Sequence, residues 1–257
     1  MNFRKMHGLG NDFVILDQKE IKNGMLTNAQ IRHICDRHLG VGCDLLTVLE
    51  PSGNADIFAR FYNADGSESA ACGNATRCVA DILMKEQGID VCTIETGGGV
   101  LNCSRADEGM VSVDMGAPVS VEDLDLTEGP LSGPIGVNMG NPHCVFFVDD
   151  AENISVETLG TKVENNPMFP DRTNVEFVQV LSDTRMRQRT WERGCGITLA
   201  CGSGACAVAV AGIHAGKTAR KVEIELDGGS LFIEITEDEH VLMTGPVADV
   251  FQGKLTL

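Results

Sequence analysis

The sequence predicts a mixed α/β fold made of two similar halves, and three observations carry this prediction. Segments with strand-like and helix-like patterns follow one another along all 257 residues. A Gly-Asn pair stands before a strand-like run twice, at Asn11 and at Asn141. A Cys-Gly pair stands before a helical run twice, at Cys72 and at Cys201. The two asparagines and the two cysteines are separated by nearly the same stretch of chain, close to half its length, so we expect two structurally similar halves that face one another.

Hydrophobic periodicity places the individual elements along the chain. Short apolar or alternating runs predict strands at 13–16, 45–49, 91–95, 111–115, 145–148, 175–181, 222–226 and 231–235. Apolar residues at helical spacing predict helices at 27–38, 73–87 and 202–215. Thr27 or Asn28 can cap the first helix, and Gly40 lies just beyond its end.

The segment 116–136 separates the two halves in the sequence. It contains Pro118, Pro130 and Pro134, and such punctuation is typical of turns and linkers. We therefore expect an N-terminal half at 1–117, completed by a C-terminal strand at 248–257, and a C-terminal half at 118–247.

Composition and charge exclude several classes of function. The formal net charge is −17, whereas a protein that binds nucleic acid or anionic lipid normally presents a basic face. The longest apolar run, at 205–213, is about half of the roughly 18 residues that a membrane span needs. The segment from Met1 to Phe13 carries polar groups throughout and lacks a secretory apolar region. We expect a cytoplasmic protein that binds neither nucleic acid nor membrane.

The ten cysteines contain no Cys-x-x-Cys pair, so the usual zinc and thioredoxin signatures are missing. Cys92 and Cys103 lie in apolar, strand-like segments, and Cys78 and Cys206 lie inside predicted helices. We expect these four to be small core residues. The sequence also shows no recognisable metal-ligand spacing, P-loop or pyridoxal-binding lysine. We therefore expect neither a metal nor a cofactor.

Cys72 and Cys201 differ from the other cysteines because each stands at the start of a helix, next to a glycine. The first turn of a helix presents unpaired N–H groups, which stabilise a thiolate and bind a carboxylate. Two such starts on one small molecule would offer a thiol to each face of a carbon beside a carboxylate. That arrangement predicts stereoinversion by two acid/base groups. There are two alternatives from other functional classes. The cysteines could form a redox disulfide, or the chain could bind an amino acid without turnover.

Seven motifs, which occur in order over nearly the whole chain, resemble the diaminopimelate epimerase family of pyridoxal-independent amino-acid epimerases. They are KMHGLGNDF at 5–13, NADGSE at 63–68, CGN at 72–74, GNPH at 140–143, TNV at 173–175, ERG at 192–194 and ACGSGA at 200–205. The resemblance implies two pseudo-symmetric α/β halves, each a curved sheet around a central helix, with the active site in the cleft between them. It also implies a homodimer and a cofactor-independent reaction that interconverts LL- and meso-diaminopimelate, in lysine and cell-wall precursor biosynthesis.

The resemblance assigns roles to individual residues. It implies that Cys72 and Cys201 are the acid/base pair and that His143 assists them. The carboxylate of the reacting carbon would be held around Gly73, Asn74, Gly202 and Ser203. The rest of the substrate would be contacted by Asn11, Asn63, Asn141, Asn174, Glu192 and Arg193. This set fits the chemistry, because asparagine both donates and accepts, and arginine binds a carboxylate through two N–H groups.

Three positions depart from the family pattern. Leu45 replaces a glutamine that normally reaches toward the substrate, Ala75 replaces a glycine, and Ile197 replaces a residue that is often Glu or Pro. These changes leave open a racemase of another amino acid, such as histidine. Arg185, Arg187 and Arg189 alternate along the chain, and we expect them on a solvated strand face, with a patch that attracts diacids as the alternative.

Overall fold

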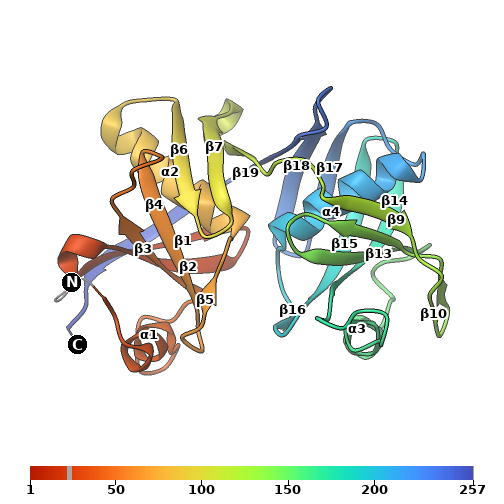
Figure 1. Cartoon of the computed structure of the whole chain (residues 1–257), viewed down its shortest axis with the longest axis horizontal. Helices are drawn as coiled ribbons and strands as arrows, with labels where there is room; N and C mark the ends of the chain where they lie inside the picture. Colours follow the sequence, from red (N-terminus) through yellow and green to blue (C-terminus); the bar gives the residue numbers. More distant parts are fainter. Residues whose placement is uncertain (22–24, 257) are drawn as a thin grey trace. The chain divides into compact units, whose positions relative to one another are not determined.

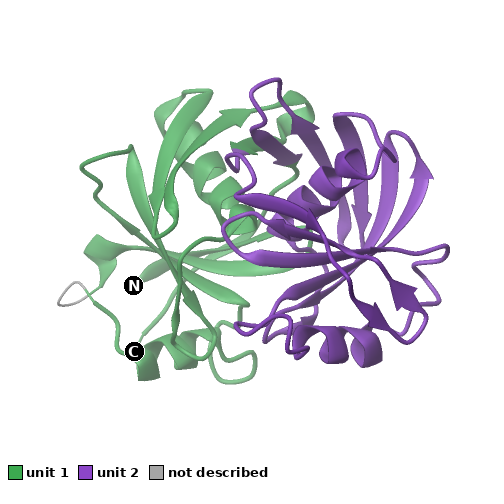
Figure 2. Ribbon diagram, turned by 45° about the vertical axis from the view of Figure 1, so that its right-hand side comes forward, with its two compact units in different colours: residues 1–113, 245–257 green, residues 114–244 purple. Residues whose placement is uncertain are grey.

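The computed structural model describes residues 1–21 and 25–256, and they form two compact units (Figure 2). Unit 1 comprises Met1–Val113 and Gly245–Leu257, and unit 2 comprises Asp114–Thr244. The chain leaves unit 1 within strand β8 (Val111–Asp114) and returns within β19 (Val241–Gly245). No helix in the described part of the chain is both long and apolar enough to cross a membrane.

Unit 1 is built on one mixed sheet, and its successive neighbours are β20, β1, β2, β3, β4, β6, β7 and β8. Their bounds are β20 (Ala248–Lys254), β1 (Asn2–Gly8), β2 (Asn11–Asp17), β3 (Leu45–Glu50), β4 (Ile57–Asn63), β6 (Val91–Thr96) and β7 (Gly99–Arg105). The short β5 (Glu68–Ser69) pairs with β4. The β2–β3 and β4–β6 pairs are parallel, and the other pairs are antiparallel.

The helix α2 (Gly73–Gln87) lies inside the curve of this sheet (Figure 1). It contacts β1 and β2 on one side and β6 and β7 on the other, so the sheet must wrap around it. The shorter α1 (Asn28–Cys35) packs on the opposite face through Ile31, Ile34 and Cys35. Two 3-10 turns, Gln18–Glu20 and Asp107–Gly109, complete the unit.

Unit 2 repeats this order strand for strand, as β9, β12, β13, β14, β15, β17, β18 and β19. The bounds are β9 (Ser120–Asp123), β12 (Ile135–Asn138), β13 (Pro142–Phe147), β14 (Asn174–Ser182), β15 (Arg185–Glu192), β17 (Lys221–Leu226) and β18 (Gly229–Ile235). The short β16 (Gly196–Ile197) pairs with β15, and β10 (Thr127–Glu128) forms a hairpin with β11 (Leu131–Ser132). The pairs β13–β14 and β15–β17 are parallel, as in unit 1.

The central helix of unit 2, α4 (Gly202–His214), is apolar on all sides, and residues 204–212 are buried throughout. A helix without a polar face is stable only when it is surrounded, and α4 contacts strands from β9 to β18. The helix α3 (Val156–Glu164) covers the other face of the sheet, where Leu159 and Val163 meet Phe146 and Phe177. The predicted fold of two repeated α/β halves is therefore confirmed.

Two expectations about individual elements are wrong. The first helix ends at Cys35 rather than at residue 38, because Asp36 is extended and Ile34 accepts hydrogen bonds from the N–H groups of Val41 and Gly42. The segment 116–136 is not a linker, since it holds β9, β10 and β11 and the first residues of β12. Its prolines lie outside these strands, which is where strand pairing tolerates them.

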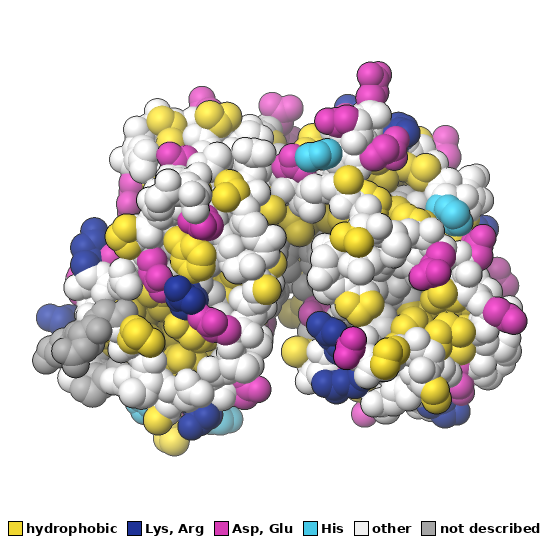
Figure 3. All heavy atoms as spheres, in the orientation of Figure 1, with side chains coloured by type: hydrophobic (Ala, Val, Ile, Leu, Met, Phe, Trp, Pro, Cys, Tyr) yellow, Lys and Arg dark blue, Asp and Glu magenta, His cyan; other side chains and the backbone are white. Residues whose placement is uncertain are grey.

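Charged side chains are scattered among uncharged ones on the molecular surface. On the face shown in Figure 3, Asp and Glu side chains are spread over both units. Most arginines of the described chain are paired with carboxylates, such as Arg60 with Glu50 and Glu68. The strongly negative total charge therefore coexists with local neutralisation of the positive groups.

Candidate active site

Cys72 is the residue that caps the N-terminus of α2, and it is half-buried. Its Sγ lies 3.9 Å from Oδ1 of Asn11, and Nδ2 of Asn74 donates to the same oxygen at 3.2 Å. The structure thus brings together the first turn of α2 and the start of β2. Three residues predicted for the site, Cys72, Asn74 and Asn11, share one small volume of unit 1.

Asn11 is held by a carboxylate network that sequence reasoning missed. Its Nδ2 donates to Oδ2 of Asp44 at 3.0 Å, and Arg37 contacts both Asp44 and Asp12 at 2.7 Å. Burial opposes ionisation of Asp12, but Arg37 and Lys5 together hold the pKa of its carboxyl well below the ordinary range. Asp44 therefore fixes the amide that faces Cys72.

Asn63 is hydrogen-bonded to a different segment of unit 1. It ends β4 and donates through Nδ2 to Oγ of Ser67 at 2.9 Å, inside the turn that follows. Gly73 begins α2 and is buried. The N–H groups in the first turn of a helix have no acceptor within the helix, so the turn from Gly73 onward has the polarity that a carboxylate needs.

In unit 2, Cys201 caps the N-terminus of α4 and is 6% exposed. Its Sγ accepts from the Gly204 N–H at 3.4 Å and lies 3.7 Å from Oγ of Ser203. Burial raises the pKa of this thiol well above its ordinary value, and the nearby carboxylates Glu192 and Glu176 raise it further. At Cys201, burial and like charge therefore oppose the stabilisation of a thiolate that a helix start provides.

A continuous chain of side chains leads from Cys201 into the interior of unit 2. Asn141 donates through Nδ2 to Oγ of Ser203 at 3.2 Å. Its Oδ1 lies 3.1 Å from Nε2 of His143, and the other ring nitrogen lies 2.8 Å from Oε1 of Glu176. His143 and Glu176 are almost completely buried. The predicted residues Cys201, Ser203, Asn141 and His143 are thus joined in one network.

The predicted substrate-binding residues near β14 and β15 are positioned by backbone contacts. Nδ2 of Asn174 donates to the Pro142 carbonyl at 2.9 Å, and its Oδ1 accepts from the Arg193 N–H at 3.0 Å. The guanidinium of Arg193 is exposed and reaches the Asp171 carbonyl. Glu192 accepts from Oγ1 of Thr198 at 2.5 Å. Gly202 is buried in the first turn of α4, as Gly73 is in α2.

Glu176 is the functional candidate that sequence reasoning missed in unit 2. It lies within the apolar run of β14, between Val175 and Phe177. A carboxylate at a buried strand position is rare unless it is paired, and this anomaly in the sequence was the available signal.

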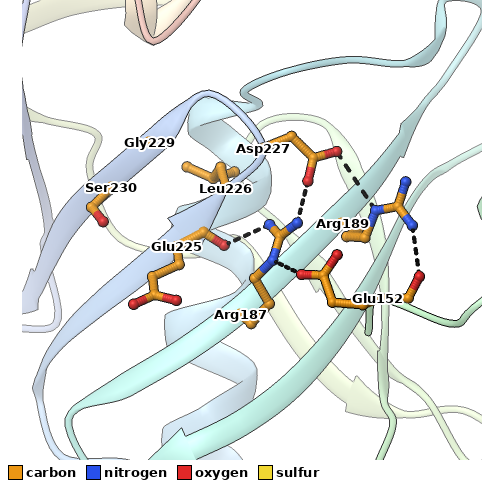
Figure 4. Close-up of a pocket in the computed structure, with 8 residues that line it drawn as sticks. All are labelled: Glu152, Arg187, Arg189, Glu225, Leu226, Asp227, Gly229 and Ser230. Carbon is orange, nitrogen blue, oxygen red and sulfur yellow. Dashed lines mark hydrogen bonds and ion pairs between the residues drawn. The ribbon is translucent and has the colours of Figure 1, made fainter. Parts of the chain in front are cut away.

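The three alternating arginines of β15 are each paired with a carboxylate. Arg187 is mostly covered, and it contacts Glu152 and Asp227 (Figure 4). Arg185 pairs with Glu225 at 2.6 Å. The hollow beside them, of about 660 Å³, is lined by these paired side chains. Arg185 is exposed, as expected for a solvated strand face, whereas Arg187 is largely covered.

Several solved structures share the fold of this chain. The chain is similar to a hydroxyproline epimerase from Agrobacterium vitis, with a TM-score of 0.73, 15% identity, and coverage of 98% of this chain and 91% of that one. It is also similar to a predicted epimerase from Pseudomonas aeruginosa, with a TM-score of 0.72, 18% identity, and coverage of 100% and 99%. At these identities the likeness concerns the fold.

The sequence comparisons identify the family. The family model for diaminopimelate epimerase matches residues 3–121 and 135–250. A diaminopimelate epimerase of Rhodospirillum centenum is 51% identical, over 99% of this chain and 92% of its own length. A diaminopimelate epimerase of Acidiphilium cryptum is 48% identical, over 98% and 95%. The chain belongs to the diaminopimelate epimerase family.

Proposed function

We propose that this chain is a diaminopimelate epimerase that inverts one α-carbon with Cys72 and Cys201 as its two acid/base groups. The activity follows from full-length similarity to diaminopimelate epimerases at about half of all positions. The proposal for the chemistry rests on one observation. Each of the two repeated units carries a single cysteine at the N-cap of its central helix, with hydrogen-bonding side chains beside the sulfur.

The proposed reaction consists of two proton transfers. The thiolate of one cysteine takes the α-proton, so that a C–H bond breaks, an S–H bond forms, and the electron pair passes into the carboxylate. The thiol of the other cysteine then gives its proton to the opposite face of the carbon. Negative charge gathers on the carboxylate between these steps, and unpaired N–H groups at a helix start stabilise such charge.

The environment of Cys201 supports the role of proton donor in the resting enzyme. Its raised pKa keeps the thiol protonated at neutral pH, which is the form that a general acid requires. Cys72 is then the base in the direction in which Cys201 donates. In the reverse direction the two cysteines exchange roles, as microscopic reversibility demands.

The distal end of the substrate carries a second ammonium and a second carboxylate. We assign the carboxylate to Arg193, whose exposed guanidinium can bind it through two N–H groups, and the ammonium to Glu192. Asn174 acts through Arg193, since its side-chain oxygen accepts from the Arg193 backbone. Asn11, Asn63 and Asn141 are the further proposed contacts.

From the family resemblance alone we propose a cytoplasmic homodimer that acts without a cofactor in lysine and cell-wall precursor biosynthesis. Sedimentation of the purified chain tests the assembly, and a monomer at micromolar concentration would contradict it. Fractionation of cells that express the chain tests the location, and recovery with membranes would contradict it.

Isotope exchange tests the substrate assignment. Diaminopimelate and histidine are incubated separately with the chain in D2O, with a reductant and without pyridoxal phosphate. We expect deuterium at Cα of diaminopimelate and none in histidine. Exchange in histidine alone would instead show that Leu45, Ala75 and Ile197 mark a changed substrate. Exchange in neither would favour the binding or redox function.

A further inference from the structure

The strands beneath α4 carry a buried polar group at positions where the matching strands of unit 1 are largely apolar. Strand register makes the match explicit: Phe13 pairs with Leu45 in unit 1, and His143 pairs with Asn174 in unit 2. Two positions further along each second strand stand Thr47 and Glu176. The next strand places Phe61 opposite Thr47 and Thr190 opposite Glu176.

Glu176 lies directly under the first turn of α4. A Cβ added at Gly204 would come within 2.7 Å of Oε1 of Glu176. The equivalent residue of α2 is Ala75, whose Cβ is accommodated in a fully buried position. The glycine of α4 therefore makes room for the carboxylate, and the departure of Ala75 from the family pattern matches the absence of a carboxylate at Thr47.

The Glu176 carboxylate has one partnered oxygen and one unpartnered oxygen. Oε1 is hydrogen-bonded to His143, whereas Oε2 is buried and has no hydrogen-bond partner among the described residues. Burying a carboxylate with one oxygen unpaired lowers the stability of the folded chain. Glu176 acts on Cys201, because it is one of two carboxylates that raise the pKa of the thiol.

We propose that Glu176 is a positioning residue for Cys201: through His143 and Asn141 it holds Ser203 beside the sulfur, and it places negative charge beneath the thiol. The inference rests on the proposed two-cysteine reaction. The proposal implies that the surroundings of the two acid/base cysteines differ. The first turn of α2 has Asn74 in place of Ser203, and unit 1 has Thr47 in place of the Glu176 carboxylate.

Site-resolved alkylation tests this proposal without any substrate. Iodoacetamide is added to the wild-type chain and to the Glu176→Gln variant from pH 7 to pH 12, because the pKa of Cys201 lies well above its ordinary value, and alkylation of each cysteine is followed by mass spectrometry. The charged and polar side chains that act on Cys201 are Glu176, Glu192 and Ser203. His143 is hydrogen-bonded to Glu176, and only Glu176 is changed. We expect the midpoint for Cys201 to move to lower pH by about one unit, the effect of one nearby charge, with the Cys72 midpoint unchanged.

A purely structural role for Glu176 would give a different result. Because burial also raises the pKa of Cys201, loosened packing would lower its midpoint in Glu176→Asp, which keeps the charge, as much as in Glu176→Gln. An unchanged midpoint for Cys201, or an equal shift at Cys72, would overturn the proposal. Because this measurement needs no turnover, its result does not depend on whether the epimerase assignment is right.

Kinetics of matched variants separate geometry from charge. Glu176→Asp keeps the charge but shortens the reach to His143, so we expect kcat to fall about tenfold with KM within twofold and the Cys201 midpoint still raised. Thr47→Val is the control at the equivalent place in unit 1, and we expect it to change neither quantity. Equal losses in both variants would contradict a role specific to Cys201.

If Glu176→Gln does not fold, Gly204→Ala tests the same contact from the helix side. The added Cβ would lie 2.7 Å from Oε1 of Glu176 and 3.2 Å from Sγ of Cys201, so we expect kcat to fall at least fivefold with little change in KM. Ala75→Gly is its counterpart in unit 1 and should retain kcat within twofold. Full activity in Gly204→Ala would overturn the proposal.

Discussion

The two units share a strand order and a helix start but differ in what they bury under the helix. Unit 1 places Phe13, Thr47 and Phe61 in its paired strands, and unit 2 places His143, Glu176 and Thr190 at the matching positions. The apolar shell is sufficient for the fold, since unit 1 has the same architecture. The polar residues of unit 2 are therefore not needed for the fold itself, and we attribute them to their action on Cys201.

Unit 1 buries its charges in other places. Arg77 and Asp81 are buried in α2, and the position of Arg77 corresponds to Cys206 in α4. Gly8 provides space for the Arg77 guanidinium, since an added Cβ would lie 2.8 Å from Nη2. The two units thus share a backbone architecture but bury different polar side chains at different positions.

The largest expected effect concerns the pair of cysteines themselves. Cys72→Ala and Cys201→Ala should each lower kcat about a thousandfold or more, because each removes one proton-transfer group. Cys78→Ala and Cys206→Ala remove buried thiols of the same two helices and should keep kcat within about threefold. Steady-state kinetics of the four variants decides the point, and normal turnover in either member of the first pair would contradict the mechanism.

Exchanging the polar residues between units should give the next largest effect. His143→Phe imports the residue of unit 1 and strips Oε1 of Glu176 of its partner, so the free energy of unfolding should fall by about 3 kcal/mol. The double variant His143→Phe/Glu176→Thr should recover stability to within about 1 kcal/mol of wild type, without recovering activity. Urea unfolding measures both. Additive losses would show that the two side chains are not coupled.

The response to acid should depend on a carboxylate of unit 1 that unit 2 lacks. The pKa of Asp12 in the folded chain lies below its ordinary 3.8, so its stabilisation is present above that value and is lost as the pH falls toward the folded pKa. The matching residue of unit 2 is Pro142. Asp12→Asn should therefore flatten the fall in Tm below about pH 4. Parallel Tm profiles for wild type and variant would contradict this.

The smallest effect distinguishes the two outer helices. Thr27 caps α1 in a reciprocal arrangement with Gln30, whereas Ser155 makes no side-chain cap hydrogen bond to α3. Thr27→Ala should lower the free energy of unfolding by about 1 kcal/mol, and Ser155→Ala by less than about 0.5 kcal/mol. Denaturant unfolding of both variants checks the difference, and the reverse order would be evidence against the capping assignment.

The two-unit architecture was predictable because the repeat places similar signals twice, although strands β1, β4, β7, β12 and β19 were not predicted. All eight predicted strands and the helices α1, α2 and α4 are present. The helix α3 was missed because Gly160 interrupts its pattern, although an added Cβ there would lie 2.5 Å from Trp191 and only glycine fits. Strand β15 was indicated only by its alternating arginines, and the carboxylates that pair with them come from other elements, which no local pattern records.

The candidate site was predictable in its residue types and less so in its connections. The motif around Cys201 pointed to the thiol, but its raised pKa depends in part on Glu176, which belongs to strand β14 and meets it only through the fold. In the same way, Asp44 reaches Asn11 across the sheet. Long-range contacts of this kind have no signature in hydrophobic periodicity or in short motifs.

Early-time deuterium labelling tests the two-cysteine claim most directly. One stereoisomer of diaminopimelate is mixed with the chain in D2O, and both isomers are analysed before a tenth of the substrate has reacted. If each of two cysteines carries a single exchangeable proton, the product carries deuterium at the inverted carbon, while the remaining substrate carries almost none. Product that retains the substrate hydrogen, or deuterium appearing equally in both isomers, would indicate a single base and contradict the account.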